Sequence, residues 1–320
     1  MIYFIIFVTL FILEVVYFKI ADRFNIIDKP NERSSHSQIT LRGGGIIFYL
    51  GVLIYFVWSG FQYPWFFLGL TLMSVVSFAD DVMTLSNKIR LLMHFSSVLL
   101  IAYELQIFTL PWYYLAIAFI LIVGVINAYN FMDGINGITA SYSLAVGALL
   151  VIVNHRFEFI DQDLLLFTLL GVLVFSFFNF RVKAKCFAGD VGSVSIAFIL
   201  LFALGALILK TGNYIYILFL AVYGIDSVWT IIRRLSRREN IFEAHRSHLY
   251  QFLGNEAGVN KLLIAFLYGL VQFMIGLAII YITDESFIFQ LSFSLVLLVV
   301  LSAFYLVYKT YIIKNYVTSN

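Results

Sequence analysis

Polar side chains recur every three residues in NAYNFMDGING, residues 127–137, which lies between two long apolar runs. Asn130, Asp133 and Asn136 hold these positions, and Gly134 follows the carboxylate. A plain connecting loop needs no amide and carboxyl groups at this spacing. Oxygen ligands of these kinds suit a hard divalent cation, so we interpret the stretch as a candidate binding loop. The alternative is a turn that caps the next helix.

A pair of acids, Asp80 and Asp81, ends the third apolar run. The C-terminal end of a helix disfavours negative charge, so a doubled acid there favours a functional role. Neighbouring helical positions point about 100° apart, and we therefore expect one carboxylate to face a ligand while the other supports it. The alternative is an acid pair at the membrane surface that captures Lys88 or Arg90.

FAGDVGS, residues 187–193, sets Asp190 between two glycines, which permit close approach of a ligand to the backbone. The ring of Phe187, just before them, suits stacking on a flat ring. Asp190 is therefore a candidate ligand-binding residue, and its alternative role is the N-cap of the helix that follows.

Two imidazoles and a guanidinium occur within four residues of AHRSHLYQ, residues 244–251: His245, Arg246 and His248. Arginine binds phosphate through paired hydrogen bonds. Histidine is mostly neutral at pH 7, so attraction to anionic lipid does not explain the histidines. That attraction does explain the four arginines upstream, Arg233, Arg234, Arg237 and Arg238.

The elements that position these residues must be formed in lipid. Hydrophobic residues make up 62% and charged residues 12% of the 320 positions, whereas soluble domains are about 45–50% apolar and about 25% charged. We predict an all-α polytopic membrane protein. The net charge of +2 gives no argument for binding nucleic acid. Cys186 is the only cysteine, which excludes an internal disulfide and a metal-binding cysteine pair.

Eleven apolar runs approach the length of about 20 residues that a membrane-spanning helix needs. No soluble domain fits between them, so we expect residues 1–320 to form a single membrane domain. The runs are 1–20, 44–60, 62–79, 90–109, 110–127, 138–153, 164–180, 192–209, 214–232, 261–282 and 287–308.

The lysines and arginines predict the orientation of these spans. With the N-terminus outside, 18 of the 20 basic residues face the cytoplasm, and only Arg156 and Lys210 lie in outer loops. The C-terminus is then cytoplasmic, and all the polar stretches described above face the cytoplasm together. The stretch 127–137 is the inner loop that carries no basic residue.

Carboxylates and phosphate-binding groups at an inner membrane surface suit one chemistry in particular. Mg²⁺ usually binds through one or two carboxylates plus substrate phosphates. Phosphoryl transfer needs a metal, an aligned nucleophile and groups that absorb charge on the leaving phosphate. A membrane-embedded protein with these features can join a soluble nucleotide donor to a lipid phosphate acceptor.

NAYNFMDGINGITA, ADDVMTLSNKIRL, FAGDVGS and AHRSHLYQ, together with RSSHSQITLRGGG at 33–45, resemble the motifs of the polyprenyl-phosphate N-acetylhexosamine-1-phosphate transferases. The peptidoglycan lipid I synthase is a relative of this family. The resemblance implies a multi-pass protein of the bacterial inner (cytoplasmic) membrane. It also implies transfer of a sugar 1-phosphate from a UDP-sugar to undecaprenyl phosphate, with release of UMP, to start a cell-envelope glycan such as O-antigen or capsule. The implied cofactor is Mg²⁺, with Mn²⁺ as a substitute.

The same resemblance assigns roles to individual residues. Asp190 matches a metal-binding aspartate, and Asp80 with Asp81 matches an acid pair of which one member positions or deprotonates the lipid phosphate. Phe187 matches a ring that stacks on uracil. The remaining matches are Asn130, Asp133, Gly134 and Asn136, around the metal, pyrophosphate and uridine, and His245, Arg246 and His248, near the pyrophosphate and sugar.

Three departures limit the resemblance, and one is that QITLRGGG, residues 38–45, lacks the prolines usual before the arginine–glycine run. Many relatives carry aspartate where Asn136 stands, and AHRSHLYQ lacks the histidine triplet of the lipid I synthase, which argues against the peptidoglycan precursor as substrate. The sugar, the glycan pathway, a one-step or two-step mechanism and homodimer formation are left open by the sequence.

The competing function from another class is an ion-coupled transporter. Its sites should lie near the membrane midplane on interrupted helices. In this chain only Glu14, Glu104 and Asp226 lie near or within spans, while the other candidate acids lie at inner helix ends.

Overall fold

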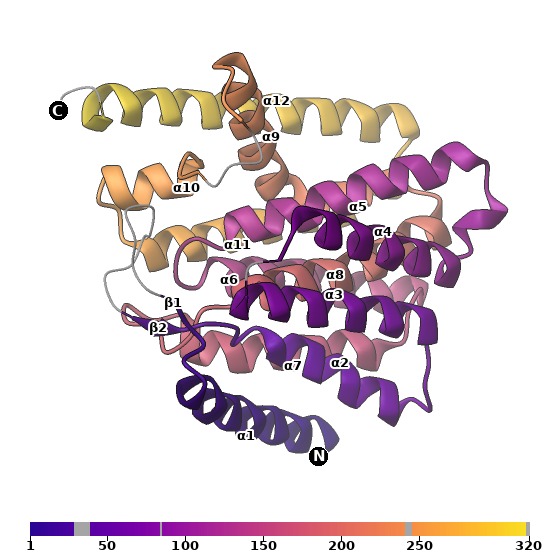
Figure 1. Ribbon diagram of the computed structural model, residues 1–320. Coiled ribbons are helices and arrows are strands. Elements are labelled where there is room, and N and C mark those ends of the chain that lie inside the picture. The colour runs from indigo at the N-terminus through magenta and orange to yellow at the C-terminus, as the bar shows by residue number, and fades with distance from the viewer. Residues whose placement is uncertain (29–38, 84, 241–244, 318–320) are drawn as a thin grey trace.

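The computed structural model describes residues 1–28, 39–83, 85–240 and 245–317. Long helices run side by side in a bundle, and short strands and turns connect them (Figure 1). The long helices are α1 (Ile2–Arg23), α2 (Ile46–Trp58), α3 (Pro64–Val82), α4 (Asn87–Glu104), α5 (Trp112–Met132), α6 (Ile138–Phe157), α7 (Gln162–Asn179), α8 (Gly189–Thr211), α9 (Ala221–Ser236), α11 (Lys261–Ile282) and α12 (Phe287–Ile312).

The short elements lie in the connections. β1 (Ile27–Asp28) and β2 (Thr40–Leu41) form an antiparallel pair. The remaining short elements are η1 (Ile107–Thr109), η2 (Tyr214–Leu220), α10 (Leu249–Gln251), η3 (Phe252–Glu256) and η4 (Ile313–Val317).

Each of the eleven apolar runs found in the sequence corresponds to a helix, which confirms an all-α membrane protein. Nine helical segments of the described chain are long and apolar enough to cross a membrane. α2 is apolar but only 13 residues long, and α4 is not among the nine. The total of eleven spans and their orientation therefore stay predictions.

α8 forms the centre of the bundle. In its most apolar stretch 89% of the residues are buried, whereas the corresponding stretch of α12 has no buried residue. A helix that is apolar all round is one that neighbours surround, and α8 packs against α3, α5, α6 and α2. α12 lies along one side of the bundle, and α9 is steeply inclined to the other helices (Figure 1). The start of α1 and the end of α12 lie at opposite ends of the bundle.

The glycine run 43–45 packs tightly against the segment that leads into α8. The backbone N of Gly44 donates to the carbonyl of Phe187 at 2.9 Å, and that of Gly45 donates to the carbonyl of Ala188 at 3.1 Å. A Cβ on Gly45 would overlap the Cα of Gly192, so these two glycines permit α2 and α8 to begin in contact. In the structure the glycine run is therefore a packed joint and not a flexible connection. Residues 33–38 of that motif lie outside the described part of the chain.

The far end of the bundle is held by different polar contacts. Glu104, at the end of α4, accepts hydrogen bonds from the backbone N of Trp65 at 2.7 Å and of Phe66 at 3.1 Å. Arg156, in the last turn of α6, and Asp284, just after α11, form an exposed ion pair at 2.7 Å. Glu104 and Asp284 therefore lie at the end of the bundle opposite the candidate site. Substitutions of these acids can serve as controls for substitutions at the site.

Candidate active site

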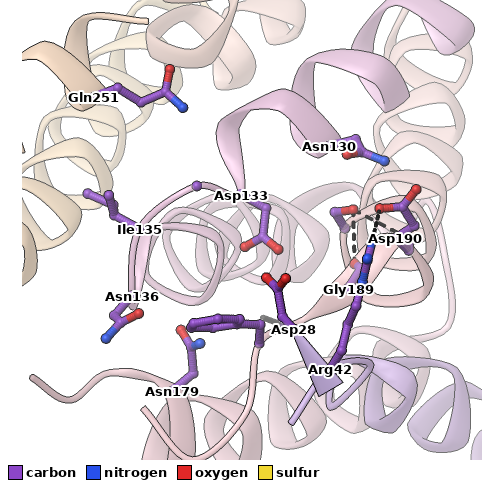
Figure 2. Close-up of a pocket in the computed structure, with 13 residues that line it drawn as sticks. Asp28, Arg42, Asn130, Asp133, Ile135, Asn136, Asn179, Gly189, Asp190 and Gln251 are labelled. Atoms are coloured by element: carbon purple, nitrogen blue, oxygen red, sulfur yellow. Dashed lines mark hydrogen bonds and ion pairs between the residues drawn. The ribbon is translucent and has the colours of Figure 1, made fainter. Parts of the chain in front are cut away.

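One cavity collects most of the polar motifs. Its volume is about 210 Å³, and it lies where α3, α5 and α7 end and α6 and α8 begin. Figure 2 shows these residues as they converge from different segments. The lining residues are Asp28, Arg42, Asn130, Asp133, Gly134, Ile135, Asn136, Asn179, Phe187, Gly189, Asp190, Ser193 and Gln251.

Asp81 is the buried support of this cavity. Its side chain has no exposed surface, and its oxygens accept hydrogen bonds from the backbone N of Asp190 at 2.9 Å and of Val191 at 3.0 Å. Asp81 therefore caps the N-terminus of α8, where negative charge is favourable. The Nε of Arg42 lies 2.6 Å from Asp81 Oδ1 and ties the glycine run to the same point.

Asp190 lies in the first turn of α8, and its carboxylate faces the cavity rather than its own helix. Oδ1 lies 3.2 Å from the guanidinium of Arg42, and Oδ2 lies 3.9 Å from that of Arg90. No side-chain bond from Asp190 caps α8, so the alternative role that the sequence allowed for it is excluded by the geometry. The side chain is 19% exposed and is available to a ligand.

Asp80 faces away from Asp81, as expected for adjacent helical positions. One oxygen accepts the backbone N–H of Leu85 at 2.7 Å, and the other lies 3.3 Å from Arg90. Asp80 therefore holds the turn after α3 and pairs with the arginine that also approaches Asp190. Asp80 and Asp81 adjoin the cavity through these arginines and do not line it.

Asp133 is the second carboxylate of the cavity. It ends α5, and its Oδ1 accepts a hydrogen bond from the hydroxyl of Thr139 at 2.6 Å. Burial raises the pKa of Asp133 to about 7; the bond from Thr139 opposes this rise, and the negative charges of Asp190 and Asp81 add to it. Figure 2 shows the carboxylates of Asp133 and Asp28 pointing toward each other across the cavity.

Amides and an aromatic ring form the other end of the cavity. Asn136 donates its amide hydrogens to the carbonyls of Arg181 at 2.8 Å and Val182 at 3.3 Å. Asn179 accepts from the backbone N of Gly137 at 2.7 Å and donates to the carbonyl of Cys186 at 2.8 Å. The loop that presents Phe187 is thereby fixed to the loop after α5. The amide oxygen of Asn136 has no hydrogen bond among the described residues.

The basic segment, residues 245–251, lies beside the cavity. Gln251 lines it, but His245, Arg246 and His248 do not. Arg246 forms an ion pair with Glu256 at 2.6 Å, and the Nδ1 of His245 lies 3.0 Å from the hydroxyl of Ser247. Residues 241–244 lie outside the described part of the chain.

Gly134 is the point where this segment meets the binding loop. A Cβ there would overlap the hydroxyl of Tyr250, which donates to the carbonyl of Phe131 at 2.9 Å. The imidazole of His245 lies 5.5 Å from the Phe131 ring, centroid to centroid. The segment that begins at His245 therefore packs on the end of α5.

The residues of the site that were not predicted as functional from the sequence include Asp28, Arg42, Arg90 and Asn179. Arg42 had a signal, because a cation directly before three glycines can be carried close to an anion. Arg90 had been considered only as the partner of an acid pair. Asp28 and Asn179 had no signal in the sequence, since each is a single polar residue at the end of an element. Only the tertiary contacts bring them to the cavity.

The donor set fits a magnesium ion that shares its coordination with a substrate. No cluster of three or more histidine, cysteine, aspartate or glutamate residues in a metal-binding arrangement occurs among the described residues. Asp133 and Asp190 nevertheless line one cavity with the amide of Asn130. Mg²⁺ usually takes one or two carboxylates and completes its shell with water and phosphate oxygens.

The chain folds as a helical membrane protein, and its carboxylates, arginines and amides gather at one end of the bundle. These features define an integral membrane protein with a polar site that suits an anionic ligand. A model of glycosyl transferase family 4 matches residues 63–210, which run from the start of α3 almost to the end of α8. The match covers a little less than half of the chain, and the relatives below are similar to the chain over longer stretches.

Three relatives are named for related activities. The probable undecaprenyl-phosphate N-acetylglucosaminyl 1-phosphate transferase of Bacillus subtilis is 27% identical over 266 residues, 77% of this chain and 74% of the relative. The undecaprenyl-phosphate alpha-N-acetylglucosaminyl 1-phosphate transferase of Thermotoga maritima is 26% identical over 81% of this chain and 83% of its own. The phospho-N-acetylmuramoyl-pentapeptide-transferase of Thermotoga maritima is 28% identical over 59% of this chain and 67% of its own.

Proposed function

We propose that the protein transfers N-acetylglucosamine 1-phosphate, or a closely related sugar 1-phosphate, from a UDP-sugar to undecaprenyl phosphate. The observation that carries this proposal is the cavity itself, in which three carboxylates, an arginine, four side-chain amides and an aromatic ring meet at one end of a membrane bundle. The names of the relatives support the acceptor and the transferred group. The two N-acetylglucosaminyl 1-phosphate transferases also align with more of the chain than the phospho-N-acetylmuramoyl-pentapeptide-transferase does.

The cavity offers a charged end and an amide end, which suit the two parts of a nucleotide-sugar. Asp133, Asp190 and Arg42 lie at the charged end, where the diphosphate would bind. Asn136 lies on the opposite side of the cavity from Asp190 (Figure 2), and Phe187 also lines the cavity, so a uracil could pair and stack there. A ring of this kind contributes about 1–3 kcal/mol of stacking with a nucleobase.

The reaction forms one phosphorus–oxygen bond and breaks another. An oxygen of the lipid phosphate attacks the phosphorus that carries the sugar, and the bond from that phosphorus to the oxygen of UMP breaks. UMP leaves with the bridging oxygen and its electron pair. A bound magnesium would neutralise charge on the diphosphate. Asp133 and Asp190 would hold this ion.

Arginines near Asp190 add positive charge where the diphosphate would lie. Arg42 is fixed between Asp81 and Asp190, and Arg90 is fixed between Asp80 and Asp190. Arginines held in this way stabilise phosphate charge without reorganising during the reaction. The acid pair at the end of α3 therefore acts here through the arginines that it orients.

The test is UMP release by purified protein given undecaprenyl phosphate and Mg²⁺ with each of several UDP-sugars. We expect UDP-N-acetylglucosamine to give the highest rate, and a lipid-linked sugar diphosphate to appear in equal amount to UMP. Release of UMP without the lipid would mean simple hydrolysis and would contradict the proposal. No turnover with any UDP-sugar would contradict it as well.

Two variants make the assay specific. Asp190→Asn should abolish UMP release. Asp284→Asn, which changes an exposed aspartate at the far end of the bundle, should keep the wild-type rate. Equal rates in both variants would show that the cavity is not the active site.

A further inference from the structure

Asp226 is a buried acid outside the cavity, and its two oxygens hold three segments together. It lies in α9 and is 2% exposed. Oδ1 accepts the backbone N–H of Leu249 at 3.0 Å and lies 3.2 Å from the Nδ1 of His248. Oδ2 accepts the hydroxyl of Tyr268, in α11, at 2.8 Å. The structure thus pairs this carboxylate with His248.

These bonds fix the proton of His248. Both oxygens of Asp226 accept hydrogen bonds, as the oxygens of an ionised carboxylate do, and so the facing Nδ1 must be the donor. In the neutral imidazole, Nε2 then has no proton and is an acceptor. The arrangement selects one tautomer of His248.

The Nε2 of His248 is buried and has no hydrogen-bond partner among the described residues. The ring lies between those of His245, 5.0 Å away, and Tyr250, 5.8 Å away, so it cannot turn freely. A buried polar atom without a partner costs about 1–3 kcal/mol, and a functional role explains why it is kept.

The neighbours of His248 in the chain connect it to the cavity in which the proposed reaction takes place. His248 begins α10, in which Tyr250 contacts the end of α5 and Gln251 lines the cavity. Asp226 binds both the imidazole of His248 and the backbone of the next residue. It therefore sets where the segment meets the cavity as well as which nitrogen carries the proton.

A second layer completes the charge balance. The hydroxyl of Thr230 lies 3.3 Å from Asp226 Oδ1 and also bonds the hydroxyl of Tyr305. The ammonium of Lys309, in α12, donates to Thr230 at 3.1 Å and contacts Tyr305. A cation at this point offsets the buried carboxylate, so His248 need not be protonated to do so.

We propose that Asp226 is a positioning residue for the transfer, which holds His248 with its proton on Nδ1 and presents Nε2 as the acceptor for a substrate phosphate. This inference rests on the proposed function. Nε2 would take the proton of a lipid phosphate monoanion, and the imidazolium would remain paired with Asp226. The proton would leave on the phosphate of UMP, so that charge and atoms balance.

The decisive variant is Asp226→Asn, which keeps the shape and one acceptor oxygen but removes the charge. We expect kcat to fall about 100-fold or more, since loss of the carboxylate that fixes a catalytic histidine's tautomer has effects of this size or larger. The KM for the UDP-sugar should stay within about threefold, and the melting temperature should stay near the wild-type value. A wild-type kcat in this variant would overturn the proposal.

A spectroscopic measurement separates positioning from a merely structural role. In protein with ¹⁵N-labelled histidine, the signals of His248 can be assigned by their loss in His248→Gln. The wild type should show the proton on Nδ1, and Asp226→Asn should change that signal. A wild-type signal with the proton on Nε2 would overturn the proposal. This readout decides the point even if the wild type transfers no sugar phosphate, which would contradict only the proposed function.

A milder change with a matched control guards against misfolding. Tyr268→Phe removes one hydrogen bond to Asp226 and should lower kcat about three- to tenfold. Tyr281→Phe changes a tyrosine of the same helix that is 84% exposed, and it should leave kcat unchanged. Equal behaviour of the two variants would contradict a role for the Asp226 network.

Discussion

Asp81 caps the helix that carries Asp190. Its two oxygens accept the backbone N–H groups of Asp190 and Val191, at 2.9 and 3.0 Å, while its own side chain is fully buried. The acid that ends α3 thus orients the acid that begins α8, although 109 residues separate them in the chain. Asp81 and Asp190 have similar sequence signals but different roles, so substitutions of the two should have different effects.

Replacing Asp81 should damage the fold more than any other change at this site. Asp81→Ala removes two bonds to the start of α8 and leaves Arg42 without its closest partner, so we expect the free energy of unfolding to fall by about 2–4 kcal/mol. The buried thiol of Cys186 gives a direct measurement, because a thiol-reactive dye labels it only on unfolding. Asp80→Ala, which removes one backbone bond and a partly exposed ion pair, should shift the transition less. A larger shift for Asp80→Ala would contradict the assigned roles.

Replacing Asp190 should damage the chemistry and leave the fold intact. Because Asp81 supplies the cap of α8, Asp190→Asn removes no capping bond, and the variant should insert and melt like the wild type. We expect UMP release to fall about a thousandfold at saturating Mg²⁺, which corresponds to about 4 kcal/mol of transition-state stabilisation. Near wild-type turnover would show that any metal is held elsewhere.

The ring of Phe187 should contribute to binding of the donor and not of the lipid. Phe187→Leu keeps an apolar side chain but removes the flat face, so the KM for the UDP-sugar should rise about five- to 100-fold, as expected from 1–3 kcal/mol of stacking. The KM for undecaprenyl phosphate is the internal control and should not change. Steady-state UMP release with each substrate varied in turn measures both. An unchanged donor KM would remove Phe187 from the nucleotide site.

The sequence predicted the helical class and the five polar stretches because both depend on local patterns. Apolar runs of spanning length and an acid next to glycines are visible without any tertiary contact. The division of labour within the acid pair was not predictable, since it depends on which of Asp80 and Asp81 meets the start of a helix 109 residues later. Asp28 and Asn179 were missed for the same reason.

The basic segment shows the other limit of sequence reasoning. His248 was predicted as a functional residue from its type, but its partner Asp226 lies 22 residues earlier, inside a predicted span. Arg233 and Arg234 lie closer to that acid in the sequence than the histidine does. Only the folded arrangement of α9 and α11 shows that the carboxylate instead holds the histidine.

Asp133 should lower the stability of the protein at the pH where it works. Burial, opposed by a hydrogen bond from Thr139 and reinforced by nearby negative charges, raises its pKa from 3.8 to about 7. Between these two values the folded protein holds a proton on Asp133 that the unfolded chain has released. The free energy of unfolding therefore falls as pH rises through this window, and the cost is complete above about pH 7.

Asp133→Asn keeps the shape and the acceptor for Thr139 but cannot ionise, so it should reverse this cost while it abolishes UMP release. We expect the melting temperature in detergent, followed by tryptophan fluorescence, to exceed the wild-type value by about 2–4 °C at pH 8, which corresponds to about 1 kcal/mol. The difference should shrink toward zero near pH 3, below both pKa values, where the folded and the unfolded wild type both carry a proton on Asp133. Asp284→Asn, at an exposed site, should show no such dependence on pH. A variant that is no more stable than the wild type at pH 8, or one that is equally stabilised at both pH values, would show that the ionised carboxylate is not a burden on the fold and that its pKa is not raised by burial.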